Sequence, residues 1–384
     1  MPIAKLKIND VCNVYDGPHA TPSPCEDGPV YLGIPSIRSD GTIDIEGSKK
    51  ISWEEYPRWT KRVTPQENDV VFSYEANLDT YAIIPPGFVG CLGRRMAIMR
   101  PNTEVVNPRF LYYYMLSPKW KEIIAKKTVT GATVNRIPIA KYPDFPIEIP
   151  TLKEQDRIAD ILSAYDKLIE NNRRQIALLD EAAQRLYKKW FIDLKFPGHE
   201  SVAIVDGIPD GWAKGSLSEL VEFKRGKTIT SAQTEAGNVP VVAGGLTPAY
   251  YHSRSNTSSP VITVSGSGAN AGYTHLYTEK IWASDCSFAD ASMTDVLPFV
   301  FESIINLGNG FKHLQRGSAQ PHVYPKHINA MPLLIPTSEL QTAFCDAATP
   351  AFSQIDVLRK EISKAMEARI RLLPKLMSGE VEVM

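Results

Sequence analysis

The feature that most constrains the fold of this 384-residue chain is an internal repeat. Shifted by 186 positions, the sequence matches itself without a gap from Gly131 to Phe191. These 61 positions contain 15 identical pairs, one of which is Gln155 with Gln341. Solenoid repeats recur every ~20–50 residues, so a single offset this long indicates instead a duplicated unit of one domain and one helix.

Each copy of the repeat predicts one long helix. In the first copy, Thr151 is a candidate N-cap, and Glu154 three residues later completes a capping box. Apolar residues then recur at alternating steps of four and three in both copies, interrupted by Asn172 in the first and by Arg369 in the second. The residues assigned to this coiled-coil seam are Ile158, Leu162, Tyr165, Ile169, Ile176, Leu179, Leu186, Ile355, Leu358, Ile362, Leu372 and Leu376.

The apolar spacing averages about 3.5 residues, which favours a coiled coil over the alternative of a helix packed only on its own domain. A helix over residues 153–190 would be about 57 Å long, which is more than one small domain can bury. Because the first helix leads into the second domain, and only a short tail follows the second helix, we expect the two helices to pair antiparallel. The prediction is two globular heads at opposite ends of a rod, related by a pseudo-two-fold axis.

We predict an α+β fold, in which two α/β domains are joined by these two long antiparallel helices. The heads contain short strand-like runs such as DVVFSY and PVITVS, separated by Gly, Pro and Asn turns, and one helix each at residues 108–117 and 297–307. Each head should therefore hold a curled, mainly antiparallel sheet. The predicted limits are residues 1–146 for the first head, 147–192 for the central helix, 193–209 for a linker, 210–332 for the second head and 333–384 for the distal helix.

Composition and charge narrow the class of protein. The sequence lacks a membrane-length apolar run and a secretory signal, and its five cysteines have no CxxC spacing, so we expect a cytoplasmic protein without disulfides. The net charge of −1 argues mildly against nucleic acid. However, residues 94–141 hold ten basic and two acidic residues, and residues 303–338 hold no acidic residue. A solvated face is the alternative, but two such segments at matching places in the repeat favour a phosphate-facing surface.

The sequence shows no convincing catalytic motif. The run SGSGANAG at residues 265–272 lacks the Lys-Ser/Thr of a P-loop and precedes a strand-like run, so we expect a turn between strands. The run PDFPIE at residues 143–148 lacks the lysine that should follow a nuclease Asp/Glu pair. HExxH, GxSxG and NPPY-type motifs are missing too. We therefore predict no catalytic residue and no metal ligand in this chain.

Two aligned polar loops, residues 128–139 and 314–325, hold the best candidates for nucleic-acid contact. Their side chains are of the types that read base edges, with Arg suited to guanine and Asn or Gln to adenine. The alternative is a tight turn whose polar groups cap neighbouring elements. The candidates for DNA contact are Asn135, Arg136, Arg316, Gln320 and His322 in these loops, Ser267, Asn270 and Tyr273 in the glycine-rich turn, and Arg38, Arg94, Arg95, Lys312 and His313 for phosphates.

Motifs along essentially the whole chain share their order, spacing and duplication with one known family. They are the helix unit IPTLKEQDRIADILSAYDKLIENNRRQIALLDEAAQRLYKKWF, the openings KLKINDV and GSLSELVEF, the phrases CLGRRMAI, TGATVNRI and GSAQPHV, and the closing LLPKLMSGEVEV. In these motifs the chain resembles the specificity (S) subunits of type I restriction–modification systems. It departs from the pattern at the start of the second helix, SELQTAFCDAA, which is less typical than the first.

The resemblance implies a non-catalytic DNA reader. Each head would be a target recognition domain for one half of a split DNA sequence, and the coiled coil would set the unread gap. The chain would bind double-stranded DNA. Two modification subunits, which hold S-adenosylmethionine and methylate adenine N6, would dock on its repeated regions. Restriction subunits that use ATP and Mg²⁺ would join them, and this chain itself would hold no cofactor.

Two other functions stay open on the sequence alone. One is a stand-alone restriction or methyltransferase enzyme with a built-in DNA reader, which the missing cofactor and carboxylate motifs disfavour. The other is a coiled-coil scaffold without DNA contact, which predicts no salt-dependent retention of DNA.

Overall fold

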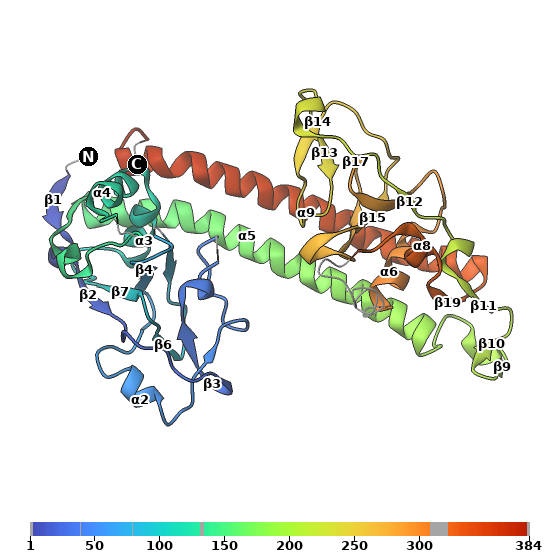
Figure 1. Ribbon diagram of the computed structural model, residues 1–384, viewed down its shortest axis with the longest axis horizontal. Coiled ribbons are helices and arrows are strands. Elements are labelled where there is room, and N and C mark those ends of the chain that lie inside the picture. The colour runs from blue at the N-terminus through green and yellow to red at the C-terminus, as the bar shows by residue number, and fades with distance from the viewer. Residues whose placement is uncertain (1–2, 39, 79, 131–133, 308–321, 382–384) are drawn as a thin grey trace. The chain divides into compact units, whose positions relative to one another are not determined.

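The computed structural model describes residues 3–38, 40–78, 80–130, 134–307 and 322–381 (Figure 1). It contains two compact units, of which unit 1 comprises residues 1–169 and 364–384 and unit 2 comprises residues 170–363. Two long helices, α5 (Leu152–Tyr187) and α9 (Ser338–Ser378), each contribute one part to each unit. The remainder of each unit is called its head below. Within the described residues, no helix is both long and apolar enough to cross a membrane.

The head of unit 1 is built on a four-stranded antiparallel sheet with the strand order β2-β7-β4-β5. A parallel pair of strands, β3 and β6, lies in a second small sheet. Buried residues such as Val70, Phe72 and Met99 place the core between the main sheet and helix α3. The elements are β2 (Cys12–Asp16), β3 (Cys25–Leu32), α2 (Tyr56–Trp59), β4 (Val70–Ser73), β5 (Tyr81–Ile83), β6 (Gly90–Leu92), β7 (Met96–Pro101), α3 (Pro108–Leu116) and α4 (Pro118–Lys127), with short 3-10 turns η1 (Ile34–Ser36) and η2 (Ile139–Asp144).

The head of unit 2 repeats this topology. Its main sheet has the order β12-β18-β15-β16, again antiparallel, and β13 pairs with β17 in parallel as β3 does with β6. The elements are β12 (Lys224–Arg225), β13 (Val239–Val242), β14 (Tyr250–His252), β15 (Val261–Ser265), β16 (Thr274–Tyr277), β17 (Trp282–Ala283), β18 (Cys286–Asp290), α6 (Leu297–Asn306) and α8 (Pro325–Asn329), with 3-10 turns η6 (Ser231–Gln233) and η7 (Gly268–Asn270). The duplication therefore extends from the helices into the heads.

A two-stranded antiparallel ribbon closes each head where its helix begins. In unit 1, β1 (Ala4–Lys7) pairs with β8 (Pro146–Ile149), and in unit 2, β11 (Ala213–Ser216) pairs with β19 (Pro332–Ile335). A short helical turn follows each first strand, as α1 (Ile8–Val11) and η5 (Leu217–Glu219). In both turns a carboxylate accepts a hydrogen bond from the backbone N–H of the last strand residue, at 2.8 Å.

The repeated Ile-Pro-Thr motif and the following glutamine form the turn from ribbon to helix. The Nε2 group of Gln155 donates to the carbonyl of Pro150 at 2.9 Å, and that of Gln341 donates to the carbonyl of Pro336 at 2.8 Å. Both glutamines are buried, at 1% and 7% exposure. The predicted capping box at Thr151 is present in one half: Glu154 accepts from the Thr151 backbone N–H at 3.0 Å and from its hydroxyl at 2.8 Å, while the backbone N–H of Glu154 donates to the Thr151 carbonyl. Burial of a glutamine side chain that satisfies a free carbonyl explains why this residue is kept in both copies.

The two long helices pair antiparallel inside each unit. In unit 1, Ile158 and Leu162 of α5 share a core cluster with Leu376 near the end of α9. In unit 2, the ring of Tyr187 on α5 lies 5.8 Å from that of Phe344 at the beginning of α9. Every one of the twelve residues assigned to the seam is buried or half-buried. The predicted fold class, two α/β domains joined by two long antiparallel helices, is confirmed.

The two polar residues that interrupt the apolar rows have partners on the opposite helix. Asn172, at 2% exposure, donates from Nδ2 to the Glu361 carboxylate at 2.9 Å in unit 2. Arg369 forms an ion pair with Asp166 in unit 1, and Asp166 also accepts a hydrogen bond from the hydroxyl of Tyr113 in the head. These interruptions are therefore interhelical polar contacts, of the kind that fixes pairing at a cost in stability.

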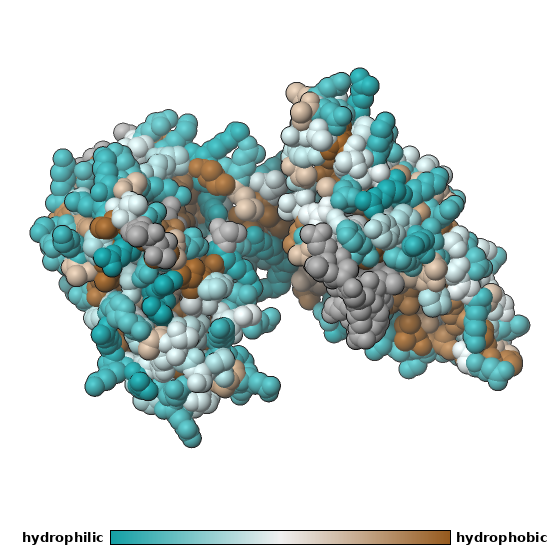
Figure 2. Space-filling view, viewed as in Figure 1, coloured by the Kyte–Doolittle hydropathy of each residue, from teal (hydrophilic) through white to brown (hydrophobic). Residues whose placement is uncertain are grey.

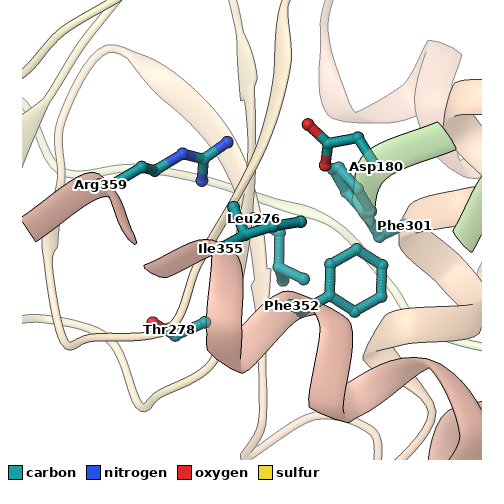
Figure 3. A pocket seen from close by; sticks show the side chains of 7 residues that line it. All are labelled: Asp180, Leu276, Thr278, Phe301, Phe352, Ile355 and Arg359. Atoms are coloured by element: carbon teal, nitrogen blue, oxygen red, sulfur yellow. The ribbon is translucent and has the colours of Figure 1, made fainter. Parts of the chain in front are cut away.

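A cavity of about 20 Å³ lies where the head of unit 2 packs against both helices (Figure 3). It is lined by Asp180 of α5, by Phe352 and Arg359 of α9, and by head residues such as Phe301. Burial raises the pKa of the Asp180 carboxyl, and the nearby Arg359 guanidinium opposes that effect. This space has room for about one water molecule, so the head packs closely on the helices here.

The structure adds detail at two places along the chain. Residues 118–127, for which no helix was expected, form α4, whose N-cap Ser117 accepts a hydrogen bond from the backbone N–H of Trp120. A π-helical turn η3 (Lys188–Ile192) ends the segment predicted as the central helix. The segment predicted as a linker, residues 193–209, contains a 3-10 turn η4 (His199–Ser201) and a hairpin of β9 (Ile204–Val205) with β10 (Ile208–Pro209). Phe196 in this segment packs against Trp212, with 5.3 Å between ring centroids. The predicted domain limits stay a prediction.

Candidate nucleic-acid interface

In unit 1, a segment of the repeat meets the hairpin that connects β4 to β5. Arg136 forms an antiparallel β-bridge with Glu75 in this hairpin. The backbone N–H of Ile137 donates to the carbonyl of Tyr74 at 2.8 Å, and that of Ala76 donates to Asn135 at 3.1 Å. Ile137 is 1% exposed, whereas its neighbour Arg136 is exposed. The sheet therefore fixes the backbone and directs the Arg136 side chain to the surface.

Unit 2 contains the same arrangement with different side chains. His322 forms an antiparallel β-bridge with Ser267 in the hairpin that connects β15 to β16. The backbone N–H of Val323 donates to the carbonyl of Gly266 at 3.0 Å, and Val323 is fully buried. The 186-residue offset that defines the repeat relates Arg136 to His322. The two predicted loops therefore occupy equivalent places in the two heads, and each lies against a hairpin turn.

Guanidinium groups gather beside the hairpin of unit 1. Arg95 has a left-handed backbone, with φ of 71°, and its Nε lies 3.3 Å from the carboxylate of Glu75. Its neighbour Arg94 is exposed and its backbone N–H donates to the hydroxyl of Tyr31 at 2.9 Å. Among the described residues, neither Arg94 nor Arg136 has a carboxylate partner. Exposed, uncompensated arginines suit phosphate oxygens and base edges.

The hairpin of unit 2 is surrounded by hydroxyl, amide and aromatic groups. Ser267 donates to Asp285 at 3.2 Å, and Asp285 forms an ion pair with Arg225. The Nδ2 group of Asn270 donates to the carbonyl of Gly244 at 3.4 Å. The ring of Tyr273, at 39% exposure, is stacked on that of His275. The candidates Ser267, Asn270, Tyr273 and His322 thus come from one hairpin and the strand segment beside it.

Sheet register reveals an exchange of charge between the two heads. Met96 pairs with Ser73 in unit 1 and Cys286 pairs with Ser265 in unit 2, so the residues just before them, Arg95 and Asp285, are equivalent. An arginine that contacts the hairpin in unit 1 is thus replaced by an aspartate in unit 2. The common scaffold presents opposite charge at this point.

Several residues of the basic segment at 94–141 are neutralised inside unit 1. Arg100 donates to both carboxylate oxygens of the buried Asp69, at 2.9 and 2.8 Å. The side-chain hydrogen bond to Asp69 raises the pKa of Arg100. Lys119 pairs with Glu148 and lowers the pKa of that carboxyl, mainly through a hydrogen bond. The excess of basic residues in this segment is therefore only partly available to a phosphate backbone.

The remaining candidates lie elsewhere. Arg38 pairs with Asp44 at 2.7 Å and lines a cavity of about 510 Å³ between the head of unit 1 and α9, together with Tyr112 and Leu373. The candidates outside the described residues are Lys312, His313, Arg316 and Gln320.

Sequence reasoning missed the hairpin partners of the predicted loops. Glu75, Asp285 and Arg225 contact the candidates only because of strand pairing, and no local sequence signal marks them. A shallow groove of about 290 Å³ in unit 2 was also missed; it is lined by Lys227, Arg254 and Trp282, among others. Cations next to a tryptophan are a recognisable combination for nucleic acid, but these three are far apart in the sequence.

Two observations concern thiols and possible metal ligands among the described residues. Burial raises the pKa of the Cys12, Cys91 and Cys286 thiols to about 12, so these thiols stay protonated at neutral pH. Within the parts of the chain that the structure describes, no group of three or more His, Cys, Asp or Glu side chains is placed to hold a metal ion.

Comparison with known proteins identifies the family. A family model described as the type I restriction modification DNA specificity domain matches residues 3–181 and 209–367, once in each copy of the repeat. The chain belongs to this family of type I specificity domains. The chain is 25% identical to the type I restriction enzyme MjaIX specificity subunit of Methanocaldococcus jannaschii, over 74% of this chain and 71% of that protein. It is 24% identical to the putative MjaX specificity subunit of the same organism, over 92% and 88%.

The fold of this specificity-domain protein also matches that of a solved structure. The S subunit of a type I restriction–modification system from M. genitalium matches with a TM-score of 0.64 and 17% identity, over 98% of this chain and 96% of that one. Two specificity domains, each with a hairpin and a repeated strand segment presenting polar side chains, are therefore the candidate interface.

Proposed function

We propose that this chain is the DNA specificity subunit of a type I restriction–modification complex, and that it recognises DNA without catalysing a reaction. The observation that carries the proposal is the equivalent placement of different side chains on one scaffold. Arg136 bridged to Glu75 in unit 1, and His322 bridged to Ser267 in unit 2, occupy matching positions on the same sheet topology. Two readers with one architecture and different surface chemistry suit a two-part DNA sequence.

In this proposal each head reads one half of the target. Arginine and asparagine at the hairpin of unit 1 match the donors and acceptors of purine edges in the major groove. Phosphate contacts supply position and affinity, while the base contacts supply sequence preference. The paired helices, whose seam is closed by apolar side chains, keep the separation of the half-sites constant.

Exposed residues of the repeat support two copies of one partner. Glu181 pairs with Arg185 on α5 at 2.6 Å, and Glu367 pairs with Arg371 on α9 at 2.6 Å, with all four side chains at least half exposed. A lysine follows four residues later in each copy. An exposed i,i+4 pair contributes only ~0.3–0.5 kcal/mol to a helix, so folding alone does not explain its retention. Each unit thus carries one copy of the same charged surface, as two identical partners require.

Helix α5 also carries exposed apolar side chains. Ile161 and Leu168 in unit 1 are 37% and 44% exposed and lie one heptad apart, and Leu178 in unit 2 is 59% exposed. Ile192, at 58% exposure, lies beyond α5 in the π-helical turn η3. Figure 2 shows apolar side chains uncovered between the hydrophilic ones on one face of each unit. Heptad spacing on an exposed helix face suits docking of a partner helix.

We propose that these partners are two modification subunits, which bring S-adenosylmethionine for methylation of adenine N6. Restriction subunits that use ATP and Mg²⁺ would complete the complex. In this proposal the cofactors belong to the partners, and this chain contributes recognition and assembly.

The proposed function is tested by methylation assays with and without the modification subunit. The chain alone should methylate and cleave nothing, and addition of the modification subunit should produce methylation of a gapped, two-part motif in sequenced genomic DNA. Methylation or cleavage by the lone chain would support a stand-alone enzyme instead. A scaffold without DNA contact would leave the methylated sequences unchanged when Arg94 and Arg136 are replaced by alanine.

Partner docking is tested separately by charge reversal. Arg185→Glu or Arg371→Glu alone should leave one modification subunit bound, and the double variant should bind none, as measured by native mass spectrometry of the mixture. Lys126→Glu is the matched control, because it disrupts an exposed i,i+4 pair outside the repeat and should leave two partners bound. Full loading of the double variant would refute this docking surface.

A further inference from the structure

We propose that Arg136 and His322 are equivalent specificity-determining residues, which read the corresponding position of the two half-sites with different chemistry. Arg136 reads a guanine in the first half, and His322 reads the matching position of the second half. This inference rests on the proposed function and assigns the base contact within it.

Backbone geometry places both side chains in the same way. The 186-residue offset of the repeat relates the two residues, and each forms a β-bridge with a hairpin residue. Each is followed by a buried aliphatic residue of the core, which is Ile137 in unit 1 and Val323 in unit 2. The hydrogen bonds that hold them, 2.8 Å from Ile137 to Tyr74 and 3.0 Å from Val323 to Gly266, are equivalent backbone bonds. The position of each reader is therefore fixed by a sheet, as precise recognition requires.

The difference between the two residues indicates contact with bases. A phosphate backbone has the same charge in both half-sites, so a phosphate contact at this position would be served by the same basic residue in both copies. The buried neighbours do stay similar, as isoleucine and valine, while the outward residue changes from arginine to histidine. A change of the outward side chain beside a buried neighbour of the same kind is expected where the sequence being read differs.

The chemistry of each residue selects a different edge. The Arg136 guanidinium is exposed and, within the described chain, has no carboxylate partner, because the nearby Glu75 is engaged by Arg95 at 3.3 Å. It is free to donate two parallel hydrogen bonds to O6 and N7 of guanine. The His322 ring is stacked on that of Tyr324, with centroids 5.8 Å apart and planes within 15°. An imidazole held by stacking presents its ring edge and cannot form the two-donor fork of arginine.

The test uses the full chain with its modification subunit and a library of duplexes with randomised half-sites. Methylated duplexes are sequenced for wild type, Arg136→Ala and His322→Arg. Arg136→Ala should lose the preference for guanine at one position of the first half by about 5- to 150-fold, with the second half unchanged. His322→Arg should introduce a guanine preference at the corresponding position of the second half.

Arg94→Ala serves as the comparison, because loss of an exposed arginine that touches only phosphates should weaken methylation at all sequences equally. Thermal melting of each variant checks that it is folded. Retention of the wild-type motif by Arg136→Ala, or equal weakening at every sequence, would overturn the inference and assign Arg136 to the phosphates. A wild-type complex without any two-part motif would refute the proposed function first, and this inference with it.

Discussion

A buried carboxyl in unit 2 makes the stability of that unit depend on pH. Glu302 on α6 is 1% exposed and faces Asp180 and Tyr187 of α5, while Asn306 on its own helix donates to it at 3.3 Å. Burial raises the pKa of Glu302 to about 8, and the neighbouring Asp180 carboxylate adds to this. The perturbation that tests it is Glu302→Gln, which keeps the shape of the side chain and removes its proton equilibrium.

The magnitude follows from proton linkage. Between about pH 4.5 and pH 8 the folded chain holds a proton on Glu302 that the unfolded chain has released. The native state therefore binds more protons than the unfolded state, and the free energy of unfolding falls by ~1.4 kcal/mol for each pH unit of increase. From pH 5.5 to 7.5 the wild type should lose about 3 kcal/mol from this group. Glu302→Gln should not show this loss.

The assay is thermal and urea unfolding of wild type and variant between pH 5.5 and 8.5, followed by tryptophan fluorescence. A difference of about 3 kcal/mol corresponds to roughly 6–12 °C in Tm for a unit of this size. The variant should match the wild type near pH 5 and exceed it at pH 8. Glu222→Gln, an exposed change in the same unit, should leave the pH profile of the wild type intact. Equal pH slopes for Glu302→Gln and wild type would show that the buried carboxyl is not the titrating group.

Three further outcomes are expected from denaturant unfolding. Asn172→Leu should raise the free energy of unfolding by about 1 kcal/mol, since it replaces a buried amide whose partner is exposed with an apolar seam residue; a loss of stability would contradict this. Gln155→Ala should lower the free energy of unfolding by about 3 kcal/mol and Gln341→Ala by about 1–2 kcal/mol. The difference is expected because Gln155 also forms hydrogen bonds with the backbone of the first head. Equal losses would argue against a contribution from these head contacts. Arg100→Ala should destabilise unit 1 by about 3–5 kcal/mol, because it leaves the buried Asp69 unpaired, and Asp69→Asn in that background should restore part of the loss.

The helices could be predicted from the sequence in detail because their signals are local. The Thr151 cap and the heptad rows depend on residues three or four positions apart, and the structure contains both. Asn172 and Arg369 were visible only as interruptions, because their partners, Glu361 and Asp166, lie about 190 to 200 residues away.

The heads were predicted less completely because their order arises from non-local pairing. Several strands have two to five residues, such as β12 at Lys224–Arg225, and so carry little periodicity of their own. Helix α4 escaped prediction because its sequence, PKWKEIIAKK, buries only Trp120 and Ile124.

In the candidate interface, too, the local features were predictable from the sequence and the non-local contacts were not. The loops that contain Arg136 and His322 were found because the repeat aligns them. The hairpins against which they lie follow from sheet register, so Glu75 and Asp285 had no signal in the sequence. Charge counting overstated the basic surface, because it cannot show that Arg100 is paired with a buried carboxylate.

The closing ribbons make each head an exchangeable cassette. In both heads the first strand is hydrogen-bonded to the last, so the chain arrives and departs at points about 4.8 Å apart, whatever the loops between them do. Insertions into the interior strands, or their complete replacement, would leave the two-stranded ribbon and the helix that follows it unchanged. One half of the molecule could thus acquire a new recognition surface by grafting at the ribbon while the other half stays as it was.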